Sequence, residues 1–124
     1  MLGSTDAVAT LAVTDIDRAK RFYEGKLGFV PLPSPEPAVL LLKSGNSKII
    51  VYASEYSGTN KATAVTWTVK DVGGTVKELK RKGVAFEHYD FPGVKMEGDV
   101  HVMGKSKAAW FKDPDGNILA IVSE

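Results

Sequence analysis

The sequence predicts an α+β fold of two βαβββ modules, which form a curved mixed sheet with the helices outside and a hollow inside. One observation is an internal repeat, because the motif V-T-D-I at 13–16 matches V-K-D-V at 69–72, 56 positions later. Another is that each half shows the same order of patterns: strand, helix, strand, strand and strand. We expect a single domain with modules of about residues 5–54 and 62–123.

In the first module, the small and β-branched residues at 7–13 predict a strand. Asp15 is a typical helix N-cap, and the apolar spacing that follows predicts a helix over 15–26 that ends at Gly28. Residues 29–32 predict a second strand, stopped by the prolines at 33, 35 and 37. The last two strands are predicted at 38–43 and 48–53, and the polar stretch 54–61 is predicted to be a linker.

The second module repeats this order. Residues 63–69 predict a strand, and Asp71 precedes a helix whose apolar face carries Val72, Val76 and Leu79. Further strands are predicted at 86–91, 107–112 and 118–122, with a tight D-P-D-G turn at 113–116. The stretch 92–105 shows little periodicity and predicts a long loop, which has a length typical of lids.

Composition excludes several classes of function. The chain has 16 Lys and Arg against 15 Asp and Glu, so its net charge of +1 favours neither nucleic acid nor an anionic membrane as a partner. The absence of cysteine excludes disulfides, thiolate nucleophiles and cysteine-based zinc sites. The N-terminus lacks the pattern of a signal peptide and no apolar run is long enough to cross a bilayer, so we expect a cytoplasmic protein.

Two stretches resemble a known family. One is A-V-T-D at 12–15 with the helix pattern that follows it, and the other is W-F-K-D-P-D-G-N at 110–117. Together with the duplication, they resemble the glyoxalase/bleomycin-resistance/dioxygenase group of the vicinal-oxygen-chelate superfamily, over nearly the whole chain. The turn can also be explained without the family, because Pro114 presets a turn angle and Gly116 supplies a positive φ.

The resemblance implies a divalent metal in the hollow, held by His, Gln or Glu on the first and last strand of each module. The corresponding positions fall near Val8, one of residues 49–51, Ala64 and Ala120, and none of these side chains can bind a metal. The four predicted strands contain no His, Asp, Glu or Cys, so a small error in register changes nothing. We therefore expect no metal, no cofactor and no Lewis-acid chemistry on a chelated substrate.

Strand alternation predicts what lines the hollow instead. If Val8 and Ala64 face it, Thr10 and Thr66 also do, and the bulkier residues of both strands pack under the helices. A small, partly polar lining leaves room for a guest molecule. The alternative is that small residues only let the two modules approach closely.

Other residues suggest a site, each with a structural alternative. Tyr52, Met103 and Trp110 are suited to line an apolar pocket, although such residues are more often core. His88 and Asp90 fall on one face of a predicted strand and could orient a ligand or act as acid and base, or form only a surface pair.

A further string, E-x-D-x-H, comprises Glu97, Asp99 and His101. It would suit a metal if it lay on a strand, but in a loop it is more often solvated. No phosphate-binding loop or nucleophile motif is present in the sequence.

We favour a metal-free binding protein that holds a small organic molecule by sequestration, as related bleomycin-resistance proteins do, and has no catalytic residues. Its ligand-binding residues are predicted to be Thr10, Tyr52, Thr66, His88, Met103 and Trp110. The alternative is a glyoxalase- or dioxygenase-like enzyme with relocated catalytic or metal-binding groups. A third possibility is an assembly or regulatory module with a vestigial hollow. A homodimer is expected, because the edge strands of the hollow need covering and two-fold assemblies are the commonest.

Overall fold

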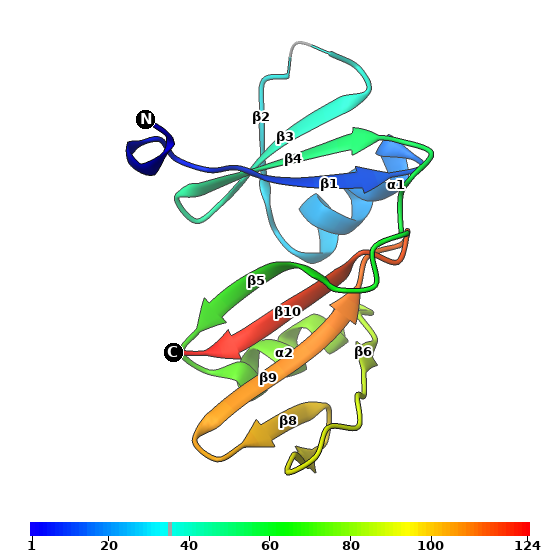
Figure 1. Ribbon diagram of the computed structural model, residues 1–124. Coiled ribbons are helices and arrows are strands. Elements are labelled where there is room, and N and C mark those ends of the chain that lie inside the picture. Colours follow the sequence, from blue (N-terminus) through cyan, green and yellow to red (C-terminus); the bar gives the residue numbers. More distant parts are fainter. Residues whose placement is uncertain (35) are drawn as a thin grey trace.

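The computed structural model describes residues 1–34 and 36–124, so the proline at 35 lies outside the described residues. Each half of the chain forms a mixed sheet with a helix against one face (Figure 1). The predicted α+β fold of two βαβββ modules is confirmed. The single curved sheet is instead two separate sheets, whose first strands lie at the edges that face each other (Figure 1).

The first sheet has the order β1-β4-β3-β2. The edge strand β1 (Ala9–Val13) runs parallel to its neighbour β4 (Ser47–Ala53), and β3 (Val39–Ser44) and β2 (Val30–Leu32) follow in antiparallel fashion. A short 3₁₀ helix, η1 (Leu2–Ser4), precedes β1. The observed strands agree with the predicted ones to within one or two residues, and the largest difference is that the strand predicted at 7–13 begins at Ala9.

The helix of the first module changes register along its length. It begins as α1 (Ile16–Lys20), capped by the Asp15 carboxylate, which accepts from two backbone N–H groups. It continues as a π-helix, η2 (Arg21–Lys26), in which the N–H of Leu27 donates to the carbonyl of Phe22 at 3.1 Å. The prediction of one helix over 15–26 is thus correct in extent, but not in its hydrogen bonding.

The second sheet repeats the order of the first. Its strands β5 (Thr63–Val69) and β10 (Ile118–Ser123) are parallel, and β9 (Ser106–Lys112) and β8 (Val100–Met103) follow in antiparallel fashion. The helix α2 (Val72–Arg81) is capped by Asp71, whose carboxylate accepts from the Gly74 N–H. The two sheets therefore correspond strand by strand, from β1 with β5 to β2 with β8.

Two predictions for the second module are wrong. The strand predicted at 86–91 is only β6 (Phe86–Glu87), which pairs with one end of β9. The predicted long loop at 92–105 is a hairpin of β7 (Lys95–Glu97) and β8, and it is β8 that takes the place equivalent to β2. The exposed, charged residues of this hairpin hide the alternation on which the prediction depended.

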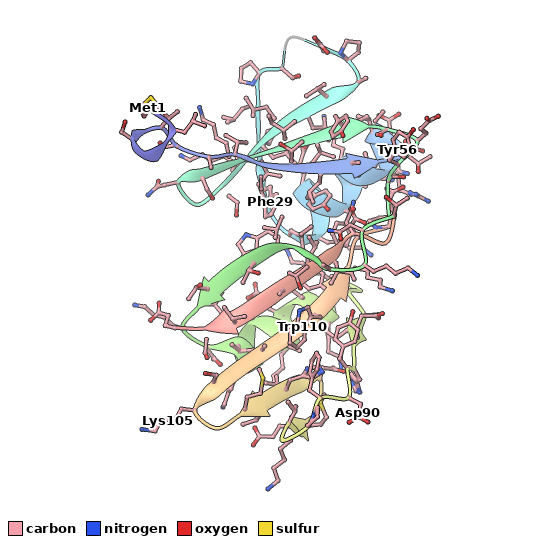
Figure 2. All side chains as sticks on the ribbon, in the orientation of Figure 1. Met1, Phe29, Tyr56, Asp90, Lys105 and Trp110 are labelled. Carbon is pink, nitrogen blue, oxygen red and sulfur yellow. The ribbon has the colours of Figure 1, made fainter. Side chains whose placement is uncertain are left out.

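A shared apolar core joins the two modules. Phe29, after η2, lies 5.7 Å from Trp67 of β5 between ring centroids, and Trp67 lies 6.3 Å from Phe111 of β9. Phe29 is found where the two modules meet (Figure 2). No helix of the described residues is long and apolar enough to span a membrane.

Candidate functional site

The face of the sheets that α1 and α2 do not cover carries most of the predicted ligand-binding residues. We call it the open face. In the first sheet Thr10 pairs with Ile50 and Ala12 pairs with Tyr52. Paired residues on neighbouring strands share a face. Thr10 and Tyr52 are exposed, whereas Leu11, which lies between Thr10 and Ala12 on β1 and points to the other face, is buried in the core. Thr10 and Tyr52 therefore belong to the open face.

The second sheet contributes two more of the predicted residues. Thr66 pairs with Ala120 on β10, and Ala120 pairs in turn with Trp110 on β9. The indole N–H of Trp110 donates to the Thr63 hydroxyl at 3.1 Å, which fixes the ring against the sheet. Met103, at the end of β8, falls on the same face two residues after His101, which pairs with Ala108.

An aromatic cluster stands on the open face of the second sheet. Its members are Tyr89, Phe91, His101 and Trp110. The His101 ring meets the Trp110 ring edge to face with centroids 4.8 Å apart, and Tyr89 and Phe91 lie 5.5 and 5.8 Å from Trp110. Figure 2 shows Trp110 on β9, beside the segment that leaves β6. Phe91 remains 43% exposed, so the cluster presents an aromatic surface to solvent.

His101 provides the cluster with a polar group. Its Nε2 accepts a 2.9 Å hydrogen bond from the backbone N–H of Tyr89, which requires the proton of the neutral ring to be on Nδ1. His101 is fully buried, and neither its Nδ1 nor the Tyr89 hydroxyl has a hydrogen-bonding partner among the described residues. Buried polar groups are nearly always paired, so an unpaired Nδ1–H and hydroxyl within one cluster are suited to a polar guest.

Sequence reasoning missed this role of His101. In the sequence, His101 stands out only as part of the E-x-D-x-H string, in a segment predicted to be a loop. The available signal was V-H-V-M at 100–103, a histidine between β-branched residues, which is the pattern of a short strand.

His88 lies at the border of the aromatic cluster, with its ring centroid 6.3 Å from that of His101. The predicted strand stops at Glu87, so the expected alternation of His88 and Asp90 on one face does not hold. The Nε2 of His88 instead lies 2.6 Å from one oxygen of Asp99, and Lys80 of α2 donates to the other oxygen at 2.6 Å. The hydrogen bonds from Lys80 and then His88 hold the pKa of the Asp99 carboxyl below its usual range.

The positions at which the resembled family binds its metal also lie on or beside the open face. Ile50 is the member of the 49–51 run that shares this face with Thr10, and Ala120 pairs with Thr66. The remaining two, Val8 and Ala64, precede Thr10 and Thr66 by two residues. All four side chains are hydrocarbon and supply no oxygen, nitrogen or thiolate donor, so they do not fit a divalent metal.

The other predicted donors do not replace them. Glu97, Asp99 and His101 diverge in the hairpin, because Asp99 bonds Lys80 and His88 whereas His101 points into the aromatic cluster. Within residues 1–34 and 36–124, no group of three or more His, Cys, Asp or Glu is placed to hold a metal ion.

A family model covers almost the whole chain. The model of the Glyoxalase/Bleomycin resistance protein/Dioxygenase superfamily matches residues 6–121. No match was found among curated proteins.

Solved structures share the fold at low sequence identity. A glyoxalase family protein from Enterococcus faecalis superposes with a TM-score of 0.74 and 19% identity, covering 98% of this chain and 99% of the other. The fosfomycin resistance protein FosX from Listeria monocytogenes gives 0.73 and 14%, with 98% and 93% covered. Lactoylglutathione lyase from Agrobacterium tumefaciens gives 0.70 and 16%, with 97% and 93% covered.

Proposed function

Because the chain belongs to the Glyoxalase/Bleomycin resistance protein/Dioxygenase superfamily, we propose that it binds a small planar or amphipathic organic molecule on the open face and needs no metal to do so. The observation that carries the proposal is the aromatic cluster with the unpaired Nδ1–H of His101. The exposed Phe91 ring provides a stacking surface, and Nδ1–H provides one directional donor. An apolar site with a few directed polar groups is the usual composition of a ligand site.

Sequestration is the activity that fits these groups best. The hydrocarbon side chains Val8, Ile50, Ala64 and Ala120 give no support for a metal-chelated substrate. The two histidines are committed to other partners, His88 to Asp99 and His101 Nε2 to the backbone of Tyr89. Holding a molecule by stacking and one hydrogen bond requires no bond to be made or broken.

We also propose that the protein acts as a symmetric homodimer. The open face of one chain leaves apolar side chains exposed, including Val8, Tyr52 and Met103 at 38% each. A second copy would cover part of this surface and enclose the guest. Analytical ultracentrifugation at micromolar concentration is expected to show a dimer, and a monomer at all concentrations would refute this part of the proposal.

Acridine, a flat apolar probe, provides the test of binding. We expect it to quench tryptophan fluorescence saturably and to raise the melting temperature of the wild-type protein. Trp110→Leu and Phe91→Ala should each weaken binding about tenfold, because base-like stacking on one aromatic ring is worth roughly 1–3 kcal/mol. The control is Tyr56→Ala, which removes an aromatic ring that is 70% exposed and is not part of the cluster.

Two outcomes would contradict the proposal. Equal affinity in wild type, Trp110→Leu and Phe91→Ala would exclude the cluster as the site. Turnover of a dicarbonyl–thiol adduct or a catechol by the purified protein would favour the alternative, an enzyme with relocated catalytic groups.

A further inference from the structure

A cavity lies on the helix side of the second sheet, where that sheet meets the β3–β4 hairpin, and both modules form its walls. Its volume is about 410 Å³, which is within the range of sites for small molecules. The first module contributes the turn after η2 and the β3–β4 hairpin, and the second contributes β5, α2 and the interior faces of β9 and β10. The aromatic rings in its wall are Phe29, Trp67 and Phe111.

The internal duplication explains why this cavity exists. In the first module, Tyr23 reaches across the junction and bonds Asp113 of the β9–β10 hairpin. The residue 56 positions after Tyr23 is Leu79 of α2, which lines the cavity together with Ser44 and Gly45 of the β3–β4 hairpin. Leucine is shorter than tyrosine, and Ser-Gly is smaller than the Asp-bearing turn. The space that a phenol and a carboxylate fill on one side of the junction is therefore open on the other.

The walls of the cavity are held in place without a guest. The indole N–H of Trp67 donates to the Ser44 hydroxyl at 3.0 Å, which ties β5 to the hairpin of the first module. The rings of Trp67 and Phe111 stack at an interplanar angle of 22°, with Phe29 5.7 Å from Trp67. A preformed wall of stacked rings loses little entropy when a flat guest enters.

The polar groups of the wall indicate an uncharged guest. The Thr75 hydroxyl donates to the Asp71 carbonyl at 2.8 Å, and the Ser44 oxygen already accepts from Trp67. Of the described lining residues only Lys43 is charged, and it is exposed. An ion would therefore enter an apolar space without a buried counter-charge, which is costly.

We propose that this inter-module cavity is a second binding site, which takes a flat, uncharged, largely aromatic molecule of about two fused rings. It is distinct from the open face, because Trp67 and Val69 of β5 alternate with Thr66 and point to the other side of the sheet. A guest here contacts both modules at once, so its binding stabilises the junction between them.

The experiment uses 2-naphthol as the probe and methyl-labelled protein observed by NMR. Saturable shifts are expected for methyl groups of the wall, at Leu27, Val69 and Ile121. Leu79→Phe is designed to fill the cavity with a ring at the position equivalent to Tyr23. It should keep a folded spectrum and weaken 2-naphthol binding at least tenfold.

The matched control is Tyr56→Phe, at an exposed residue outside both the cavity and the aromatic cluster, and it should bind 2-naphthol as wild type does. If Leu79→Phe does not fold, Val69→Phe fills the same space from β5 and carries the same expectation. The proposal is overturned if the wall methyls show no saturable shift at millimolar 2-naphthol, or if a folded filling variant binds as tightly as wild type. It is also overturned if Trp110→Leu, rather than Leu79→Phe, abolishes binding, a result that would instead support the open face as the only site of aromatic guests.

Discussion

The phenol of Tyr23 donates a 2.6 Å hydrogen bond to the carboxylate of Asp113, and both residues are buried. The bond joins the helix of the first module to the closing hairpin of the second. Asp113 also accepts from the backbone N–H groups of Asp115 and Asn117, which form the turn. One carboxylate thus shapes the turn and fastens it to the other module.

Tyr23→Phe removes one donor to this buried carboxylate without changing the ring. We expect the free energy of unfolding to fall by about 2 kcal/mol, because a hydrogen bond to a charged group is lost and an acceptor remains buried. Urea unfolding at neutral pH measures the change. Tyr56→Phe, at a residue that is 70% exposed, is the control and should be neutral. An equal loss in both variants would assign the effect to something other than the bond to Asp113.

The same bond predicts a loss of stability in alkali. Burial, followed by the negative charge of Asp113, raises the pKa of Tyr23 far above its usual value of 10.0. A group with a raised pKa contributes its full stability below the unfolded pKa and loses it as the pH increases. Above pH 10.0 the wild-type advantage over Tyr23→Phe should therefore narrow by about 1.4 kcal/mol per pH unit. Urea unfolding of the pair at several alkaline pH values tests this, and a constant difference would contradict it.

Gly58, in the linker between the modules, should tolerate no side chain. Its φ is 69°, and a Cβ atom there would lie 2.0 Å from the carbonyl oxygen of Asp115. Gly58→Ala is expected to cost roughly 3 kcal/mol, from backbone strain and the steric clash together. Gly104→Ala separates the two causes, since Gly104 has a φ of 63° but no neighbour within 4 Å. Thermal unfolding should show a smaller loss for Gly104→Ala, and equal losses would mean that the clash is relieved without cost.

Asp99→Asn tests the ion pairs at the edge of the second sheet. Lys80 and His88 hydrogen-bond this carboxyl and lower its pKa, so its contribution is present above the unfolded pKa and is lost as the pH falls. At neutral pH the variant should be less stable by up to about 1 kcal/mol, since Lys80 and His88 are largely exposed and solvent screens the pairs. Well below pH 3.8 the wild type and the variant should converge. Asp90→Asn, at an exposed position, is the control and should leave the free energy of unfolding at neutral pH unchanged.

Divalent metals should leave the melting temperature unchanged. After exhaustive chelation, Zn²⁺, Ni²⁺, Fe²⁺ and Mn²⁺ are expected to give no saturable stabilisation, whereas an organic guest at 100 times its dissociation constant should add about 2.7 kcal/mol. A thermal-shift series with metals and planar compounds in parallel makes the comparison. Stoichiometric stabilisation by one metal would contradict the metal-free site and direct attention to the donors outside the expected strands, which are His88, Glu97, Asp99 and His101.

Sequence patterns predicted the fold well where the structure is periodic. The equivalent caps Asp15 and Asp71 and the strand at 63–69 could be predicted because alternation and capping are local properties. The β7–β8 hairpin was missed because its first strand is exposed on every residue, so no apolar side marks it. The π-helical turns were missed because apolar spacing over one or two turns does not distinguish hydrogen-bond registers.

The candidate site was harder to predict than the fold. Alternation alone places Thr10 and Thr66 on a common face, and the structure agrees with that reasoning. The contact of His101 with Trp110 depends on the pairing of β8 with β9. The sequence of neither strand alone indicates which other strand it pairs with. The inter-module cavity depends on side-chain volumes on both sides of a junction, which periodicity does not encode.

The closing turn also has a consequence for how the protein is made. The Asn117 side chain donates to the carbonyl of Ala12, a contact between residues 105 positions apart, and Asp115 accepts from the backbone of Thr14 across 101 positions. On the ribosome, the first module can be complete in sequence long before these partners are synthesised. The polar groups at the end of β1 and the hydroxyl of Tyr23 therefore remain hydrated, without their protein partners, until almost the whole chain has emerged. Contacts of such long sequence separation form late and slowly, so a nascent chain that lacks its last hairpin remains open at the junction.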